Sequence, residues 1–485
     1  MEQVLTKRNT LILVTVLALW RLYLSATLQL HPDEAYYWLW SRYLDVGYFD
    51  HPPMVAYFIW LSTLFSKSEL WVRFSGTLVL LLLSGLMWRL AMQLYKSVPV
   101  AAGSVLLFNL YPLTMLGMIV ITPDVPILLF WSVSVYLFWQ VIHSQKAWLW
   151  YPLGVTFGLA LLSKYTAILM VPCFFIYLIL TDERRWLKTI HPYLAIVVGL
   201  VCFLPVVIWN RSNEWVSFLF QLKHGLGADD VEASNAAVYT AGQMLIAGPV
   251  VWILGMYAAG VSLYRRDKET LLLVCTAVPV ILFFGITSVR KLAGPNWPVF
   301  AYFSFSLLVS QYCLEVYSKL RRSLWTAAML TTLALSLIIT LHARFSFIPL
   351  ASYSAELASA DTTNGFYGWR ELGAELKKSG GQNFAITPSH QLSAEIIYYT
   401  DASITAQTAR LSRPSQFNLL ALPKNPRERD RFYVWTDADY PDLGPAYLVA
   451  STHNNKFNTY REGRVVRSYH IISGEPALVP PALGK

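Results

Sequence analysis

The 485-residue sequence predicts a polytopic α-helical membrane protein of about 11 transmembrane helices, followed by a small C-terminal α/β or α+β extracytoplasmic domain. The first observation behind this prediction is composition: 55% of the residues are hydrophobic, 15% aromatic and 14% charged, with a mean hydropathy of +0.44. Soluble domains carry roughly 25% charged residues, so a soluble globular protein is excluded. The second observation is a change near residue 345, where the long apolar runs end. The sequence therefore predicts a membrane domain, 1–344, and a soluble domain, 345–485.

The net charge of +9 belongs almost entirely to the predicted membrane domain. Residues 1–344 carry a net charge of +8, and residues 345–485 carry +1. A basic excess in a hydrophobic chain is typical of membrane loop topology, so no nucleic-acid partner is expected. The cysteines lie inside apolar runs without the spacing of a metal site or a disulfide, and are expected to be buried thiols: Cys173, Cys202, Cys275 and Cys313.

The first apolar run, 10–30, follows Lys7 and Arg8. Its length of about 20 residues can cross the hydrocarbon layer and exceeds that of a cleavable signal, which predicts an uncleaved signal anchor. The run 54–66 has only about 13 residues and is expected to be an interfacial or re-entrant segment. Further spans are expected at 74–94, 98–119, 125–143, 148–162, 165–181, 190–209, 238–263, 270–288, 296–316 and 323–343.

Loop charges predict the orientation of these spans. Lys and Arg gather in the loops on one side: Lys7, Arg8, Lys96, Lys146, Arg184, Arg185, Lys188, Arg265, Arg266, Lys268, Lys319, Arg321 and Arg322. The opposite loops hold most of the acids: Asp33, Glu34, Asp45, Asp50, Glu69, Asp124, Glu214, Asp229, Asp230 and Glu232. Basic loops stay in the cytoplasm, so the acidic loops and the C-terminal domain are expected to face the periplasm of a bacterial inner membrane.

Two of the outward loops are long, 31–73 and 210–237. The second contains apolar residues at helical spacing over 214–226, which predicts an amphipathic helix on the membrane surface. In the soluble domain, helices are expected at 368–378 and 390–399, and strands at 383–387, 431–436, 446–450 and 464–472. The soluble domain has no glycine-rich phosphate loop and no Walker motif.

The candidate catalytic and binding residues lie in the loops predicted to face outward. Asp33 and Glu34 are adjacent carboxylates directly after the first span. Desolvation at a membrane boundary and a neighbouring carboxylate both raise a carboxyl pKa, which suits a general base. The alternative is that these acids merely decorate an outward loop. Asp50 and His51, fixed before two prolines, suit the binding of phosphate, a metal or an acidic sugar, or else mark a helix start.

The shorter outward segments add one carboxylate and three cations. Asp124 begins a membrane helix, where the helix dipole favours a carboxylate, so capping is one interpretation. Lys164 interrupts two short apolar runs and either snorkels to the interface or meets an anionic headgroup. Arg290 and Lys291 lie on the outward side against the positive-inside rule, and a bound phosphate would explain the pair.

In this order the motifs resemble those of the GT-C membrane glycosyltransferases. The motifs are Asp33-Glu34, Asp50-His51-Pro52-Pro53, Pro123-Asp124 and Lys164-Tyr165-Thr166. The nearest resemblance is to the bacterial branch that includes protein O-mannosyltransferases and the lipid A aminoarabinose transferase. It covers residues 1–344 and, more weakly, 368–372 and 391–399 of the tail.

The resemblance implies an inverting glycosyltransferase that moves a single sugar from a polyprenyl-phosphate donor to an envelope acceptor (lipid A, core, other glycan or protein). It makes Asp33, beside Glu34, the catalytic base and gives Asp124 a supporting role. Phosphate or substrate binding falls to Asp50, His51, Lys164, Tyr165, Arg290 and Lys291. A divalent cation, Mg²⁺ or Mn²⁺, held by Asp33 and Asp124, stays open, because no residue cluster with metal-ligand spacing requires one.

The sequence departs from the aminoarabinose transferases at two places. His51 stands where that group has lysine, and Ala35 and Tyr36 stand where it has an arginine. That donor is therefore not assumed: the His-Pro-Pro form is nearer to mannosyltransferase-like members, and core galacturonosyltransferases are a further alternative. Two other readings stay open, a lipid-linked sugar transporter or flippase without covalent chemistry, and a GT-C enzyme that transfers a preassembled oligosaccharide.

Overall fold

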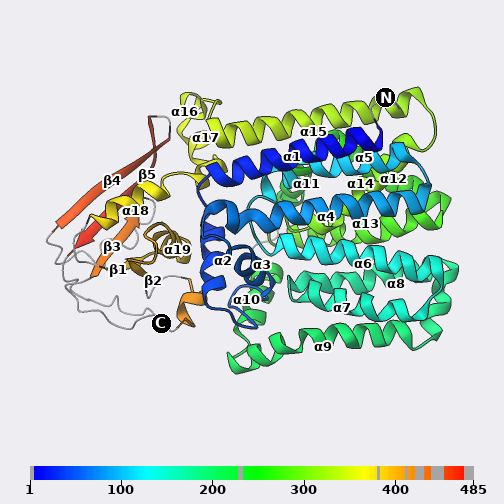
Figure 1. Cartoon of the computed structure of the whole chain (residues 1–485), viewed down its shortest axis with the longest axis horizontal. Helices are drawn as coiled ribbons and strands as arrows, with labels where there is room; N and C mark the ends of the chain where they lie inside the picture. Colours follow the sequence, from blue (N-terminus) through cyan, green and yellow to red (C-terminus); the bar gives the residue numbers. More distant parts are fainter. Residues whose placement is uncertain are drawn as a thin grey trace. The chain divides into compact units, whose positions relative to one another are not determined.

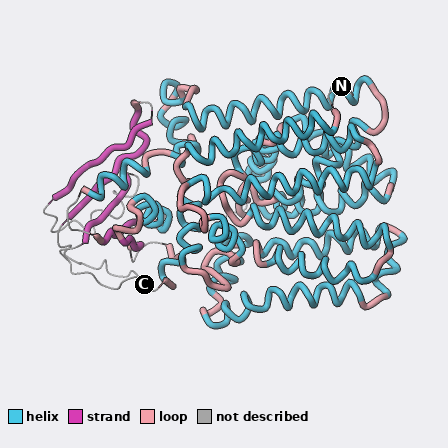
Figure 2. Tube along the Cα trace, in the orientation of Figure 1, coloured by secondary structure: helices cyan, strands magenta, loops and turns pink. Residues whose placement is uncertain are grey.

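A computed structural model describes residues 5–227, 233–378, 383–409, 413–420, 431–437, 453–461 and 463–473 (Figures 1 and 2). Contacts group the chain into two units. The first comprises Met1–Ala26 and Leu44–Thr340, and the second comprises Thr27–Tyr43 and Leu341–Lys485. The segment Thr27–Tyr43, which follows the first apolar run, therefore groups with the C-terminal part of the chain.

Six helices in the described part of the chain are long and apolar enough to cross a membrane, and Figure 1 shows them running in nearly parallel directions. They are α1 (Lys7–Thr27), α4 (Glu69–Tyr95), α6 (Asp124–Ser144), α9 (His191–Ser212), α13 (Lys268–Ser288) and α15 (Lys319–Phe345). Shorter apolar helices pack among them: α5 (Val98–Leu110), α7 (Trp150–Leu161), α8 (Met170–Leu180) and α14 (Tyr302–Leu314). The protein is thus a multi-pass helical membrane protein, while the total of about 11 spans stays a prediction.

Two of the predicted spans contain a break in the helix. Within 238–263, the chain bends by 106° between α11 (Ala233–Ala247) and α12 (Pro249–Arg265). Gly248 has a φ of 93°, which glycine adopts without strain, and Pro249 starts the new helix because it needs no amide hydrogen there. Within 98–119, α5 ends at Leu110, just before Pro112, and a single π-helical turn follows.

A buried arginine satisfies the carbonyl groups that this second break leaves open. Arg21 of α1 is buried and donates to the backbone oxygen of Asn109, at the end of α5, and to that of Thr114. It also donates to Oδ1 of Asn109 at 3.1 Å. The last carbonyls of a helix lack intrahelical partners, so Arg21 ties α1 to the interruption after α5.

The loops predicted to face outward contain three short helices. They are α2 (Pro32–Arg42) in the second unit, and α3 (Met54–Ser62) and α10 (Val216–Leu226) in the first. Helix α3 has 9 residues, too few to span a bilayer, as expected for the run 54–66. Helix α10 confirms the helix predicted at 214–226.

The second unit contains a mixed five-stranded sheet in the order β2-β1-β3-β5-β4. Its strands are β1 (Phe384–Thr387), β2 (Thr405–Thr408), β3 (Arg431–Thr436), β4 (His453–Arg461) and β5 (Arg464–Ser473). Strand β1 pairs in parallel with β2 and β3, and β5 pairs antiparallel with β3 and β4. Helix α19 (His390–Tyr399) connects the parallel pair β1 and β2, and α18 (Trp369–Lys377) precedes β1.

The sequence predicted most of this unit. Helices α18 and α19 and strands β1, β3 and β5 are confirmed, whereas β2 and β4 were not predicted. The predicted strand 446–450 lies outside the described residues. Strand β4 begins with His453-Asn454-Asn455-Lys456, a polar sequence that is typical of a loop and becomes a strand only by pairing with β5.

Candidate active site

Helix α2 gives the adjacent carboxylates Asp33 and Glu34 different surroundings. His31 is the N-cap of α2, and Pro32 occupies the first helical turn. Oε2 of Glu34 accepts a hydrogen bond from the backbone N–H of His31 at 2.8 Å, which completes a capping box. Glu34 has 0% of its surface exposed, whereas the Asp33 side chain is 46% exposed. Glu34 therefore closes the start of the helix, and Asp33 is the accessible carboxylate of the pair.

Residues of the C-terminal sequence surround Asp33 within the second unit. Helix α19 packs against α2, and Nε2 of Gln391 lies 3.5 Å from Oδ1 of Asp33. The neighbouring His390 packs against Tyr36 with 4.4 Å between the ring centroids and the rings tilted by 60°. Burial, and then the positive charge of Arg413, lower the pKa of His390 to about 3, so this histidine is neutral near pH 7. The sequence analysis missed Gln391 and His390 because nothing local links helix 390–399 to residue 33.

Asp124 lies at the centre of a cluster in the first unit. Its Oδ1 accepts a hydrogen bond from Nζ of Lys164 at 2.7 Å, and its Oδ2 accepts one from the side-chain amide of Asn296. The side chains of Lys164 and Asp124 are only 12% and 4% exposed. Asp124 is the first residue of α6, Lys164 follows α7, and Asn296 lies in the loop after α13. Two of the predicted site residues are therefore in direct contact.

Asn296 was not predicted as a site residue. The segment 290–298 had been singled out for its cations, Arg290 and Lys291. In the structure Arg290 is exposed and Lys291 is half-buried, and Asn296 is the residue of this segment that contacts Asp124. The dense glycine and proline content of the segment was the one available signal, because it holds the backbone in a fixed loop.

The remaining predicted residues lie close to α10. Gln221 of α10 donates from Nε2 to the backbone oxygen of Asp50 at 2.6 Å, and Asp50 is buried directly before His51 and α3. The hydroxyl of Tyr165 lies 2.7 Å from Oγ of Ser217, also on α10. Helix α10 therefore contacts two of the segments that carry predicted substrate-binding residues.

The predicted site residues are divided between the two units. Asp33 and Glu34 belong to the second unit, and the others belong to the first: Asp50, His51, Asp124, Lys164, Tyr165, Arg290 and Lys291.

Both oxygens of the Asp124 carboxylate are engaged by neighbouring side chains. In the part of the chain that the structure describes, no group of three or more His, Cys, Asp or Glu side chains is arranged to hold one. Both carboxylate oxygens of Asp124 accept hydrogen bonds, and the ammonium of Lys164 occupies the place where a cation would bind. The metal role of Asp33 and Asp124 stays a prediction, and no step is derived from it.

Comparisons with known proteins agree with this architecture. Residues 50–209, which include Asp124 and Lys164, match the family described as dolichyl-phosphate-mannose-protein mannosyltransferase. The lipid A galacturonosyltransferase RgtD of Rhizobium johnstonii is 25% identical over 314 residues, which cover 63% of this chain and 65% of that protein. The match therefore spans somewhat less than two thirds of that relative.

Solved structures show the same fold. The crystal structure of ArnT from Cupriavidus metallidurans bound to undecaprenyl phosphate superposes with a TM-score of 0.66 at 15% identity, and the match covers 96% of this chain and 98% of that chain. The oligosaccharyltransferase of Archaeoglobus fulgidus gives a TM-score of 0.50 at 13% identity, covering 82% of this chain and 64% of that chain. These findings confirm the resemblance to the GT-C membrane glycosyltransferases inferred from the sequence.

Proposed function

We propose that this chain, which has the GT-C glycosyltransferase fold, is an inverting glycosyltransferase of the bacterial inner membrane. It moves a single sugar from a polyprenyl-phosphate donor to an envelope acceptor on the periplasmic side. The main support is the low-exposure ammonium of Lys164, held by Asp124 at the start of the membrane helix α6. A fixed cation at this position is suited to the phosphate of a lipid-linked donor.

The Lys164 ammonium can bind a leaving phosphate while it contacts Asp124. An ammonium group has three N–H donors, and one of them donates to Oδ1 of Asp124. Asn296 and Lys164 together hold the Asp124 carboxylate, so the cation is oriented before the donor binds. Because the Lys164 side chain is shielded from water, its positive charge acts more strongly on a phosphate than it would in solution.

Asp33 is the proposed general base. Its half-exposed carboxylate accepts the proton of an acceptor hydroxyl, whose oxygen attacks the anomeric carbon of the sugar. The bond between the anomeric carbon and the phosphate oxygen breaks, and polyprenyl phosphate leaves with the electron pair. One displacement of this kind inverts the configuration at the anomeric carbon.

The donor and acceptor classes are supported by the relatives. ArnT was solved with bound undecaprenyl phosphate, which is the product that this reaction would release. RgtD is named for lipid A, which favours a lipid-type acceptor here. His51, in place of the lysine of the aminoarabinose transferases, keeps the sugar itself open between a neutral hexose and an acidic sugar.

The experiment offers the purified protein a set of polyprenyl-phosphate sugars and measures the release of polyprenyl phosphate. Donor-dependent release that is lost in Asp33→Asn, and kept in the matched control Asp401→Asn, supports the proposal. Asp401 is an exposed aspartate of the second unit. No release with any donor, together with lipid translocation in vesicles, would instead support a flippase.

A further inference from the structure

The second unit contains a polar cavity of about 650 Å³ that the proposed reaction does not use. The cavity is lined by the last turn of α15, by the connector that follows it and by the β4–β5 hairpin. Arg461, Arg464 and Arg467 line it, and among the described lining residues Asp361 is the one carboxylate. The wall therefore carries more positive than negative charge.

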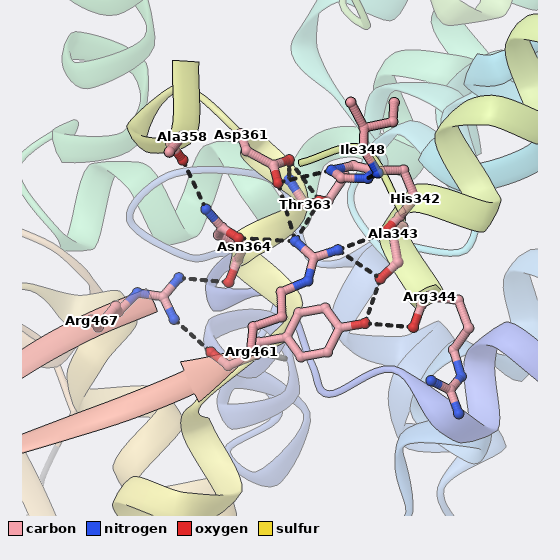
Figure 3. A network of polar contacts seen from close by, with 11 residues as sticks. His342, Ala343, Arg344, Ile348, Ala358, Asp361, Thr363, Asn364, Arg461 and Arg467 are labelled. Atoms are coloured by element: carbon pink, nitrogen blue, oxygen red, sulfur yellow. Dashed lines mark hydrogen bonds and ion pairs between the residues drawn. The ribbon is translucent and has the colours of Figure 1, made fainter. Parts of the chain in front are cut away.

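A network of hydrogen bonds and one ion pair holds Arg461 in the wall of this cavity (Figure 3). It is only 5% exposed, and its guanidinium donates to Oδ2 of Asp361 at 3.1 Å and to Oγ1 of Thr363 at 2.9 Å. It also donates to the backbone oxygen of His342 at 2.6 Å and stacks over the ring of Tyr367 at 4.2 Å. This network holds Arg461 in one position, so its charge is in place before any ligand binds.

The network leaves positive charge uncompensated. Burial alone would raise the pKa of Asp361, but hydrogen bonds from Thr363 and His342 and the charge of Arg461 lower it, so Asp361 is ionised and neutralises one arginine. Arg467 donates to the backbone oxygens of Tyr367 and Asn364 and lies over the ring of Trp369, none of which carries a negative charge, and Arg464 is exposed. The acid of the hairpin sequence, Glu462, lies outside the described residues.

One buried donor has no protein acceptor. Nε of Arg461 is buried and has no hydrogen-bond partner among the described residues. Buried N–H groups of native proteins are almost always paired, so an orphaned guanidinium nitrogen beside a cationic cavity points to an anionic ligand.

The cavity adjoins the end of a membrane-spanning helix. Helix α15 has 27 residues and the length and composition of a span, and His342 and Ser346 of the cavity wall lie at its C-terminal end. A helix of this length reaches the headgroup layer at its end. Large apolar side chains are exposed on the connector and the hairpin, among them Phe347 at 53% and Val465 at 52%. A charged cavity with an apolar rim at this depth suits a lipid better than a soluble anion.

We propose that this cavity binds the phosphate headgroup of a membrane lipid through Arg461, Arg464 and Arg467. Guanidinium groups match phosphate oxygens in a bidentate geometry, and Arg464, being exposed, is free to turn toward the ligand. The apolar residues Phe347 and Val465 contact the acyl chains. The site lies next to helix α2, because Gly365 of the cavity wall is in contact with His31, the N-cap of α2.

The test measures phosphatidic acid binding to the full-length chain in detergent by native mass spectrometry. Arg464→Gln removes an exposed charge without disturbing the Arg461 network, and should weaken binding roughly tenfold, the loss of about one charge-assisted hydrogen-bond pair. Thr362→Trp fills the cavity without changing the charge and should weaken binding as well. Arg211→Gln is the matched control, since Arg211 is an exposed arginine of α9 in the first unit.

Two results would overturn the proposal. If Arg464→Gln and Thr362→Trp both fold, by an unchanged thermal transition, and bind phosphatidic acid as the wild type does, the cavity does not hold the headgroup. A second arm adds inorganic phosphate to the lipid-bound protein. Displacement of the lipid by micromolar phosphate would make this a site for the free anion. Retention of the lipid supports the proposal that the bound phosphate belongs to a lipid headgroup.

Discussion

The ammonium of Lys164 lies 2.7 Å from Oδ1 of Asp124, although 40 residues separate the two along the chain. Asn296, which lies 172 residues from Asp124, donates to the other oxygen of the same carboxylate. Three loops that follow or precede different membrane helices thus meet at one buried carboxylate. This relationship makes Asp124 the residue that holds Lys164 and Asn296 in place, and it is the basis of the proposed contact between Lys164 and a donor phosphate.

The pairing predicts coupled effects of Asp124 and Lys164 on activity. Lys164→Met should lower kcat roughly 10²-fold, as expected for the loss of one group that stabilises developing charge. Asp124→Asn should lower it less, because the amide oxygen still accepts from Lys164. The double variant should lose less than the two single losses combined, since both changes act on the same ion pair. The rate of donor cleavage by each single variant and by the double variant measures these effects.

Lys223→Met is the control for the charge change, because Lys223 is an exposed cation on α10. It should leave the rate near that of the wild type. Strictly additive effects of Asp124→Asn and Lys164→Met would contradict the proposed role of the pair.

Asp33→Asn should fold and insert but lose sugar transfer by roughly 10²–10⁴-fold, the usual range for a general base. The substitution keeps the size of the side chain and its place in the first turn of α2. Transfer from a polyprenyl-phosphate sugar to a lipid acceptor is the measurement. An almost normal rate would move the base to another carboxylate.

Glu34 should respond as a helix cap and not as a base. Glu34→Gln keeps an acceptor for the backbone N–H of His31 and should retain most of the activity. Glu34→Ala removes the acceptor and should lower the free energy of unfolding by about 1 kcal/mol, the usual value of a cap. Thermal unfolding of the two variants separates these outcomes; a Glu34→Gln protein that folds well but is inactive would assign catalysis to Glu34.

The buried His390 predicts a loss of stability in acid. Its pKa is lowered to about 3 by burial and by the charge of Arg413, whereas an exposed histidine has a pKa of 6.5. Between these values the unfolded chain binds a proton that the folded chain does not, so the free energy of unfolding falls by about 1.4 kcal/mol for each pH unit below 6.5. His390→Gln should flatten this dependence, measured by denaturant unfolding from pH 7 to pH 4. His191→Gln, at the start of α9, is the control and should keep the wild-type slope.

Much of the fold could be predicted because its signals are local. Apolar runs mark the membrane helices, and the helix predicted at 390–399 is found as α19. The bend at Gly248 was not predicted, because hydropathy contains no information on the direction of the backbone. The dipeptide Gly248-Pro249 was the local signal for this bend. Strand β4 was not predicted, because its polar residues pair with β5 by backbone hydrogen bonds, which depend little on side-chain type.

In the candidate site, too, local features could be predicted from the sequence and contacts between distant segments could not. The amino-acid sequence alone determined the membrane character and the approximate positions of most helices, since these depend on residues within a few positions of one another. Only the tertiary structure decided that Glu34 is buried while Asp33 is accessible, and that Asn296 and Lys164 share Asp124. Such contacts join distant segments through packing, and packing depends on the shapes of all the helices together, which no local pattern contains.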